Sequence, residues 1–218
     1  MHERRTIDGL VGPIEIAIDR PTAAPRGAAF IGHPHPLYGG TLDNKVAATL
    51  ARTFAAAGWL AVRPNFRGVG ASAGQHDHGA GETDDFLHVI DTAPQWSAGA
   101  VGPAVPLALA GFSFGSFVAA QACVRLIERG RAPRVVVLVG AAAGKWPLPQ
   151  VPPHALVIHG EMDETIPLAD VFDWARPQEL PVVVLPGADH FFHRRLATLK
   201  RLLSAHLRAA FDAADESD

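Results

Sequence analysis

The stretch Leu107-Ala108-Leu109-Ala110-Gly111-Phe112-Ser113-Phe114-Gly115 is the part of the sequence that decides the fold. Its first four residues are apolar and predict a buried strand, and the residues after Ser113 have the spacing of a helix that ends before Gly130. Gly111 and Gly115 let the main chain turn sharply between the two. A buried strand that turns directly into a helix is typical of α/β proteins.

The same alternation of strand and helix continues on both sides of this turn. Apolar runs predict buried strands over residues 28–31, 60–63, 107–110, 135–139, 155–158 and 182–185. Amphipathic spacing predicts helices over residues 43–57, 81–92, 114–129 and 168–175, and a last helix with Leu196, Leu199, Leu203 and Leu207 on one face. Strands buried on both faces and separated by helices indicate a mostly parallel central sheet with helices on both faces.

The first part of the chain departs from this alternation. Residues 6–10 and 14–19 read as two strands, and Gly12-Pro13 marks a turn between them. We therefore expect an antiparallel hairpin at one edge of the sheet. Because we find no internal repeat and no low-complexity linker, we expect residues 1–218 to form a single α/β domain.

Composition and charge narrow the classes of function. Hydrophobic residues make up 48% of the chain and charged residues 19%, which is typical of a globular protein. The formal net charge of −3 provides no basic field for nucleic acid or an anionic membrane. The single cysteine, Cys123, excludes an internal disulfide and a multi-cysteine zinc site, and its helical context predicts a buried, inert thiol.

The ends of the chain and its apolar runs bear on location. The N-terminus, Met-His-Glu-Arg-Arg-Thr, is not followed by the apolar segment of a signal peptide. The apolar stretch near residues 101–112 is broken by Gly102, Pro103 and Pro106 and is too short to span a bilayer. We therefore expect a cytoplasmic protein without a membrane partner.

Ser113 lies at the centre of a G-x-S-x-G motif, and its position between strand and helix is that of a nucleophile elbow. A serine hydroxyl must project sharply from such a turn to meet a base and a substrate, which strains its backbone and requires small neighbours. The helix that follows offers free N–H groups to a developing oxyanion. The plainer alternative is that Ser113 only caps this helix.

Two later segments supply partners for Ser113 at the ends of predicted strands. His159-Gly160-Glu161-Met162-Asp163-Glu164 follows one strand, and a carboxylate there lies at the edge where α/β sites form. We choose Asp163 as the acid, with Glu161 and Glu164 as rivals that could equally be loop charges or helix caps.

Pro186-Gly187-Ala188-Asp189-His190 follows the last predicted strand. A neutral imidazole at His190 can accept the Ser113 proton and return it to a leaving group, while Asp163 holds the ring in the required tautomer. The chain order of Ser113, Asp163 and His190 is the order found in enzymes with a nucleophile elbow. These three residues are the predicted catalytic triad.

Further motifs carry a family resemblance. They are His33-Pro34-His35-Pro36-Leu37-Tyr38-Gly39-Gly40 with Leu42-Asp43-Asn44-Lys45, and Asn65-Phe66-Arg67-Gly68-Val69-Gly70 with Ser72 and Gly74. With the serine, acid and histidine segments, these motifs cover roughly residues 28–195. The sequence resembles the α/β-hydrolase superfamily and, within it, small lidless bacterial hydrolases related to dienelactone hydrolases.

The resemblance implies a two-donor oxyanion hole. One N–H would come from Phe114 and the other from the loop after the first central strand. Pro34 and Pro36 have no N–H and cannot serve. Leu37 is the first choice for this loop donor and Tyr38 the second.

The family often inserts a cap domain after the strand that ends at Val139. This chain has only residues 140–154 there, with four prolines among them, which is the length of a loop. We therefore expect no cap domain and an open site, with Lys145 and Trp146 as candidates for one of its walls.

Two competing interpretations are set aside. His33 with His35, and His76 with His78, form H-x-H pairs that could bind a metal, but further ligands do not follow closely. We expect His35 to pack in the oxyanion loop and the segment around His76 and His78 to be a solvated loop. Gly68-Val69-Gly70-Ala71-Ser72-Ala73 fits a dinucleotide fingerprint only superficially, because a loop and not a helix follows it.

The sequence therefore predicts a carboxylesterase-like serine hydrolase that cleaves an ester or related acyl bond of a small molecule through a Ser113 acyl-enzyme, without cofactor or metal. A thioesterase, an amidase or an acyltransferase on the same triad is the alternative, as is a non-hydrolytic ligand-binding member of the fold. Glu82 and Asp85 could support the site, although solvated charges in a first helical turn are the simpler interpretation.

Overall fold

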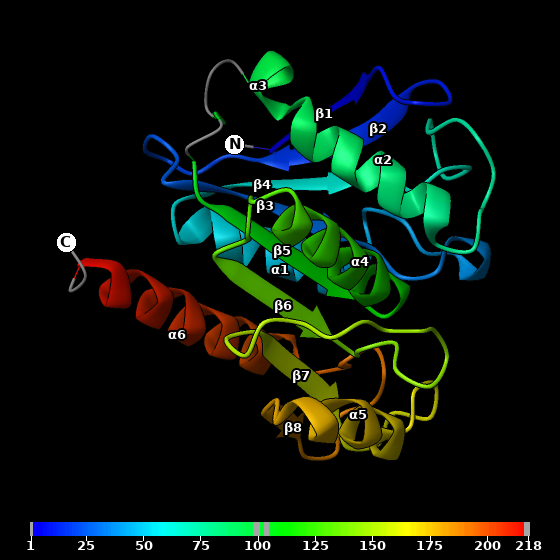
Figure 1. The fold of residues 1–218 in the computed structure, drawn as a ribbon, viewed down its shortest axis with the longest axis vertical. Coiled ribbons are helices and arrows are strands. Elements are labelled where there is room, and N and C mark those ends of the chain that lie inside the picture. The colour runs from blue at the N-terminus through cyan, green and yellow to red at the C-terminus, as the bar shows by residue number, and fades with distance from the viewer. Residues whose placement is uncertain (1, 98–100, 103–104, 216–218) are drawn as a thin grey trace.

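A mostly parallel sheet forms the centre of the computed structural model, which describes residues 2–97, 101–102 and 105–215. Its strands are β1 (His2–Ile7), β2 (Ile14–Asp19), β3 (Gly27–Gly32), β4 (Trp59–Pro64), β5 (Leu107–Phe112), β6 (Val135–Val139), β7 (Leu156–Gly160) and β8 (Val182–Leu185). Across the sheet their order is β1-β2-β4-β3-β5-β6-β7-β8. The strands from β4 to β8 are parallel, and β1 and β2 are antiparallel, which confirms the predicted architecture (Figure 1).

Helices cover both faces of the sheet (Figure 1). They are α1 (Lys45–Ala56), α2 (Ala80–Asp91), α3 (Ala93–Trp96), α4 (Phe114–Glu128), α5 (Leu168–Ala175) and α6 (Leu196–Asp215), with short 3-10 turns η1 (Pro36–Tyr38) and η2 (Arg176–Gln178). One apolar core joins the sheet to α2, α4 and α5, and a second joins it to α1 and α6. None of the described helices combines the length and the apolar run needed to cross a membrane.

The central strands show why their sequences are continuous apolar runs. In β6, Val136 and Leu138 belong to the core under α4, whereas Val135 and Val137 belong to the core under α1 and α6. Successive side chains of a strand point to opposite faces, so a strand covered on both faces must be apolar at every position.

The N-terminal hairpin is present, but the predicted position of its first strand is wrong. The prediction was residues 6–10, whereas β1 is His2–Ile7 and pairs with β2 from Ile7 opposite Ile14 back to His2 opposite Asp19. Residues 8–13 form the connection, and within it Leu10 and Val11 are exposed. The Gly-Pro pair marks only the end of this long turn. A prediction that places a tight turn at Gly-Pro therefore places the first strand too close to the turn, several residues C-terminal to its actual position.

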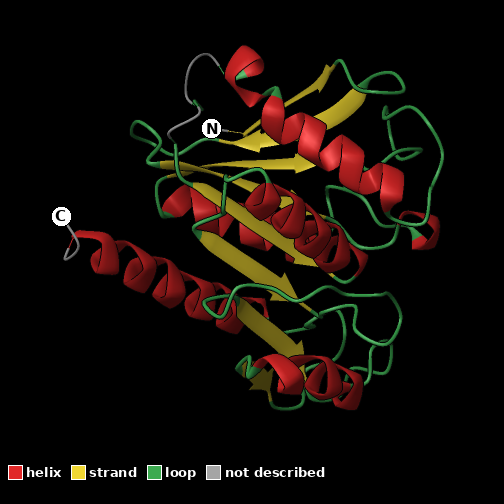
Figure 2. Cartoon of the chain, viewed as in Figure 1, coloured by secondary structure: helices red, strands yellow, loops and turns green. Residues whose placement is uncertain are grey.

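The parallel strands point toward the same side of the molecule (Figure 2), and the candidate site residues follow the carboxyl ends of these strands in the sequence. Ser113 directly follows β5, and the loops after β7 and β8 carry Asp163 and His190. Phe112 at the end of β5 pairs with Val139 of β6, and the end of β7 pairs with the end of β8. Parallel pairing therefore brings three segments that are distant in sequence to the same end of the sheet, where the carboxyl ends of the strands lie.

Candidate active site

Ser113 occupies a strained turn between β5 and α4. Its backbone angles are φ 56° and ψ −125°, and its N–H donates to the carbonyl of Val139 at 2.9 Å. A Cβ atom on Gly111 would collide with the carbonyl of Gly115, and one on Gly115 would collide with the carbonyl of Gly32. The close approach of the main chain therefore requires glycine at both positions, as the motif predicts. The strained turn makes the Ser113 side chain project at the carboxyl end of β5.

The three predicted catalytic side chains meet. His190 Nε2 lies 3.0 Å from Ser113 Oγ, and His190 Nδ1 lies 2.7 Å from Asp163 Oδ2. Asp163 Oδ1 accepts the N–H groups of Thr165 at 2.9 Å and Ile166 at 2.8 Å. An ionised carboxylate accepts hydrogen bonds only, so His190 carries its proton on Nδ1 and presents the lone pair of Nε2 to the serine.

The rival carboxylates point elsewhere. Glu161 is exposed and accepts the N–H of Gly187 at 2.8 Å, which ties two loops together. Glu164 is exposed and lies on the wall of a cavity next to Ser113. Of the three acids in this loop, Asp163 is the one whose carboxylate contacts His190.

Opposing effects set the charge of Asp163. Burial acts to raise the pKa of its carboxyl, but the hydrogen bonds from His190 and the N–H of Ile166 outweigh burial and hold that pKa below its ordinary value. The carboxylate is therefore ionised at neutral pH, which is the state that orients a histidine N–H and stabilises an imidazolium.

His159 is a second imidazole at this carboxylate, and its position was missed by sequence reasoning. Its side chain is fully buried, with Nε2 2.9 Å from the carbonyl of Ile166 and 3.4 Å from Asp163 Oδ2. Burial lowers the pKa of His159, so it is neutral and donates a proton from Nε2. The sequence feature that could have indicated this contact is the position of His159 near the end of β7, four residues before Asp163.

The loop that follows β3 is held against the sheet by His33. His33 Nδ1 lies 2.6 Å from the carbonyl of Pro34, and His33 Nε2 accepts the N–H of Phe66 at 2.9 Å. Burial lowers the pKa of this histidine to about 4. A neutral ring with its proton on Nδ1 satisfies both partners, which makes His33 a structural clamp.

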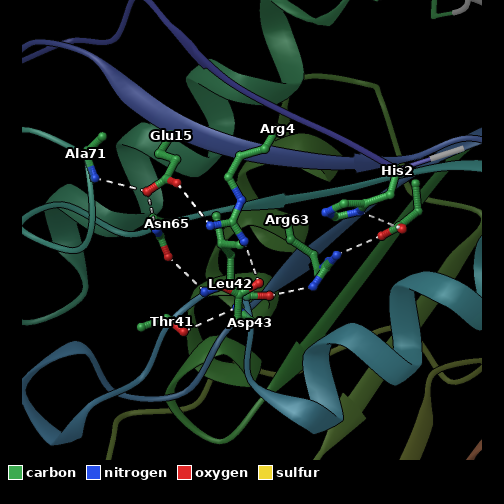
Figure 3. Close-up of polar contacts among 10 residues, drawn as sticks. His2, Arg4, Glu15, Thr41, Leu42, Asp43, Arg63, Asn65 and Ala71 are labelled. Atoms are coloured by element: carbon green, nitrogen blue, oxygen red, sulfur yellow. Dashed lines mark hydrogen bonds and ion pairs between the residues drawn. The ribbon is translucent and has the colours of Figure 1, made fainter.

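Leu42 fixes the far end of the same loop. Its N–H donates to Asn65 Oδ1 at 2.8 Å, and its carbonyl accepts from Arg63 Nη1 at 2.6 Å (Figure 3). Asn65 is itself bound to Glu15, and Arg63 to Asp19, so β2 and β4 together support the loop. These side chains are buried or nearly so, and a buried polar network of this kind favours one loop conformation, although the Nε of Arg63 has no hydrogen-bond partner among the described residues.

Leu37 does not fit the predicted oxyanion role. Its N–H donates to the His35 ring at Nδ1, 3.2 Å away, and its side chain is 68% exposed in a hollow separate from Ser113. The N–H of Tyr38, the second choice, donates to the carbonyl of His35 at 3.1 Å. The N–H groups of both residues are already hydrogen-bonded within the local turn η1, and the spacing of the motif does not indicate these bonds.

The expectation of solvated charges at the start of α2 is also wrong. Glu82 is fully buried and accepts the N–H groups of Asp77 at 3.0 Å and Gly79 at 2.8 Å, which caps α2. His76 lies 2.7 Å from the same carboxylate and its side chain is only 5% exposed. The segment around His76 therefore folds back onto the helix, while His78 is exposed as expected.

Asp85 is buried by a different interaction. Arg67 donates to both of its oxygens, from Nε at 2.8 Å and from Nη2 at 2.9 Å. This two-bond geometry fixes the loop after β4 on α2. Acidic residues in a first helical turn usually face solvent, and only the approach of Arg67 explains the burial of Asp85.

A cavity of about 490 Å³ opens beside Ser113. Its wall includes Lys145 and Trp146, as predicted, together with His35, Tyr38, Phe114 and Glu164. Residues 140–154, where a cap would be inserted, form turns and loop without a helix. Within the described part of the chain, no three His, Cys, Asp or Glu side chains are grouped as ligands for a metal ion.

Comparisons with known proteins agree with this fold. A family model described as serine aminopeptidase, S33, matches residues 39–197. A lidless α/β serine hydrolase from Xanthomonas campestris is 37% identical, with a TM-score of 0.86 over 95% of this chain and 94% of that one. An α/β serine hydrolase homologue from Coxiella burnetii is 35% identical, with a TM-score of 0.78 over 94% of this chain and 97% of that one.

A further relative is an uncharacterized protein from Rickettsia prowazekii, which is 28% identical over 92% of this chain and 86% of its own length. The family model spans most of the sequence, and both solved structures align along nearly their whole length. The chain therefore belongs to the serine aminopeptidase S33 family of the α/β-hydrolase superfamily and is a hydrolase of the α/β serine hydrolase type.

Proposed function

We propose that the protein hydrolyses a carboxylic ester through an acyl-enzyme on Ser113. The observation that carries the proposal is the continuous chain of contacts from Ser113 Oγ to His190 at 3.0 Å and from His190 to Asp163 at 2.7 Å. The first distance allows direct proton transfer from the hydroxyl to the imidazole, and the second is a hydrogen bond that fixes the orientation of the imidazole.

In the proposed reaction, neutral His190 accepts the hydroxyl proton as Ser113 Oγ attacks the ester carbonyl. Asp163 stabilises the imidazolium that results. Collapse of the tetrahedral intermediate expels the alcohol, which takes the proton from His190 Nε2. Water then attacks the acyl carbonyl and loses a proton to the same nitrogen. Collapse of the second tetrahedral intermediate returns that proton to Ser113 Oγ and releases the acid.

The oxyanion needs two N–H donors, and we assign them to Phe114 and His35. Phe114 is the first residue of α4, so its N–H has no acceptor within the helix. His35 lines the cavity with Ser113, and its main-chain N–H has no main-chain or side-chain acceptor among the described residues. This assignment replaces Leu37, whose N–H is bound to the His35 ring.

The family description favours a second candidate, release of an N-terminal residue from a peptide. Glu164 would then be the carboxylate available in the cavity for the substrate ammonium group. A panel of p-nitrophenyl esters and thioesters set against aminoacyl p-nitroanilides separates the two. Faster turnover of the esters supports our proposal, and preference for the anilides supports the peptidase.

The nucleophile itself is tested with a fluorophosphonate probe. Ser113→Ala should abolish labelling, because the probe reacts with an activated serine. The matched control is Ser204→Ala, on α6 and outside the cavity, which should label like the wild type. Labelling that survives in Ser113→Ala contradicts the assignment. Labelling of the wild type without turnover of any substrate in the panel indicates a ligand-binding protein.

A further inference from the structure

One wall of the cavity beside Ser113 is built from aromatic rings. Tyr38, His35, Phe114 and Trp146 all line it, and neighbouring ring centroids are 4.8 Å apart from Tyr38 to His35, 4.9 Å from His35 to Phe114 and 4.8 Å from Phe114 to Trp146. These separations are those of contacting rings. Phe114 is only 1% exposed and lies behind the wall, so the aromatic surface open to a ligand comes from Tyr38, His35 and Trp146.

The wall is supported from behind. Phe117 of α4 stacks on Trp146 with ring centroids 5.2 Å apart and planes inclined by 27°. Phe66 contacts Phe114 edge-on at 5.6 Å. Rings held by such packing keep their orientation, so a flat group that enters the cavity finds a preformed aromatic surface. Tyr38, at the other end, is 87% exposed and forms the outer lip.

The position of the cavity identifies which part of the substrate it receives. Ser113 lines it, whereas His190 is not among the described residues of its wall. The leaving alcohol must face His190 Nε2 to receive its proton. The acyl portion therefore occupies the aromatic cavity, whose volume of about 490 Å³ is within the range of small-ligand sites.

The charged groups of the wall argue for a neutral acyl group. Lys145 and Glu164 both line the cavity and both are exposed. The two side chains give the wall no net charge, and because both are exposed, water screens their attraction for a charged substituent. Resting on the esterase function proposed above, we propose that this wall is an acyl subsite for a neutral, planar aromatic group, as in arylalkanoic esters.

The test compares two esters that differ only in the ring. p-Nitrophenyl 3-phenylpropanoate and p-nitrophenyl 3-cyclohexylpropanoate share a leaving group, and two methylenes separate the ring from the reacting carbonyl. The wild type should prefer the phenyl ester about fivefold in kcat/KM. Tyr38→Leu and Trp146→Leu should each reduce this preference toward unity, whereas Phe172→Leu, an exposed phenylalanine of α5, should leave it unchanged.

Equal rates for the two esters in the wild type, or a preference for the bulkier cyclohexyl ester, overturn the aromatic subsite while leaving esterase activity in place. Tyr38→Leu keeps the test valid if Trp146→Leu fails to fold, because Tyr38 lies at the surface.

A binding measurement keeps the subsite and the esterase function distinguishable. The methyl esters of the same two acids are titrated into Ser113→Ala protein, which requires no turnover. Tighter binding of the phenyl ester, lost in the Ser113→Ala, Tyr38→Leu double variant, supports the subsite even if no ester is hydrolysed. Equal binding of both esters contradicts it.

Discussion

Among the described residues, two buried imidazole–carboxylate pairs near the end of the sheet have short contacts, and their local geometry is closely similar. His190 and Asp163 are 2.7 Å apart, with side-chain exposures of 6% and 0%. His76 and Glu82 are also 2.7 Å apart, with exposures of 5% and 0%. In both pairs, the carboxylate also accepts two main-chain N–H groups.

The pairs differ in what the imidazole ring contacts besides its carboxylate. His190 Nε2 reaches Ser113 Oγ, whereas the His76 ring packs among the rings of His35, His78, Phe114 and Trp146. Glu82 caps α2, so the His76 pair stabilises a helix and a loop. A short bond between histidine and carboxylate is therefore a poor sign of catalysis, and the position of a nucleophile decides which pair is reactive.

The largest difference is expected from removing each imidazole. His190→Ala should lower kcat/KM for ester hydrolysis by about 10⁴-fold or more, because His190 is the base that contacts Ser113 Oγ in the described part of the chain. His76→Ala should keep kcat/KM within about tenfold and lower stability instead. Steady-state kinetics with concentrations corrected by active-site titration separate the two. Comparable rate losses in both variants would remove the distinction between the pairs.

The second-largest effect is expected from removing the negative charge of Asp163. Asp163→Asn should reduce kcat by about 10³- to 10⁴-fold, because an amide no longer enforces the Nδ1–H tautomer of His190 or stabilises the imidazolium. Glu161→Gln, in the same loop, should change kcat less than about twofold, because its exposed carboxylate accepts from the N–H of Gly187 and not from His190. Full activity in Asp163→Asn would show that another carboxylate serves His190.

Acid should destabilise the fold through the imidazoles that lack a buried carboxylate partner. Burial lowers the pKa of His33 to about 4, below its ordinary 6.5. Between these values the unfolded chain binds more protons than the folded one, so the free energy of unfolding falls as pH drops. His33 alone should account for about 3 kcal/mol between pH 6.5 and 4.

Other groups act with the same sign. Burial is the main cause of a lowered pKa at His35 and His206, and Asp163 loses its contribution as pH falls below its ordinary 3.8 and through its lower folded value. Urea unfolding at a series of pH values measures the slope. A stability that does not change from neutral pH to pH 4 would contradict the neutral clamp at His33.

The smallest effect is expected from the carboxylate of the second pair. Glu82→Gln should lower the free energy of unfolding by about 1–3 kcal/mol, because a buried amide cannot accept all the bonds of the carboxylate. The folded variant should keep kcat near that of the wild type. Asp84→Asn, exposed on the same helix, should change stability by less than about 0.5 kcal/mol. A larger rate loss in Glu82→Gln than in Asp163→Asn would reverse the roles of the pairs.

Local pattern explains which parts of the structure could be predicted. Continuous apolar runs identify the buried strands, because a strand covered on both faces needs apolar residues throughout, and β6 and β8 have the predicted boundaries. The glycine spacing around Ser113 predicts the turn, because the close main-chain approach of Gly111 to Gly115 involves residues only four positions apart, whereas the approach of Gly115 to Gly32 is visible only in the fold. The candidate triad follows from three strand ends in one order.

The sequence by itself thus determined the order of elements, the parallel sheet and the edge at which Ser113, Asp163 and His190 meet. Only the tertiary structure distinguished Asp163 from Glu161 and Glu164, because contact with a histidine 27 residues away selects among neighbouring acids. The burial of Glu82 and the loss of Leu37 as an oxyanion donor have the same origin. Both outcomes depend on how a loop folds back onto the rest of the molecule. Such hydrogen bonds produce no periodic pattern of apolar residues that could be recognised in the sequence.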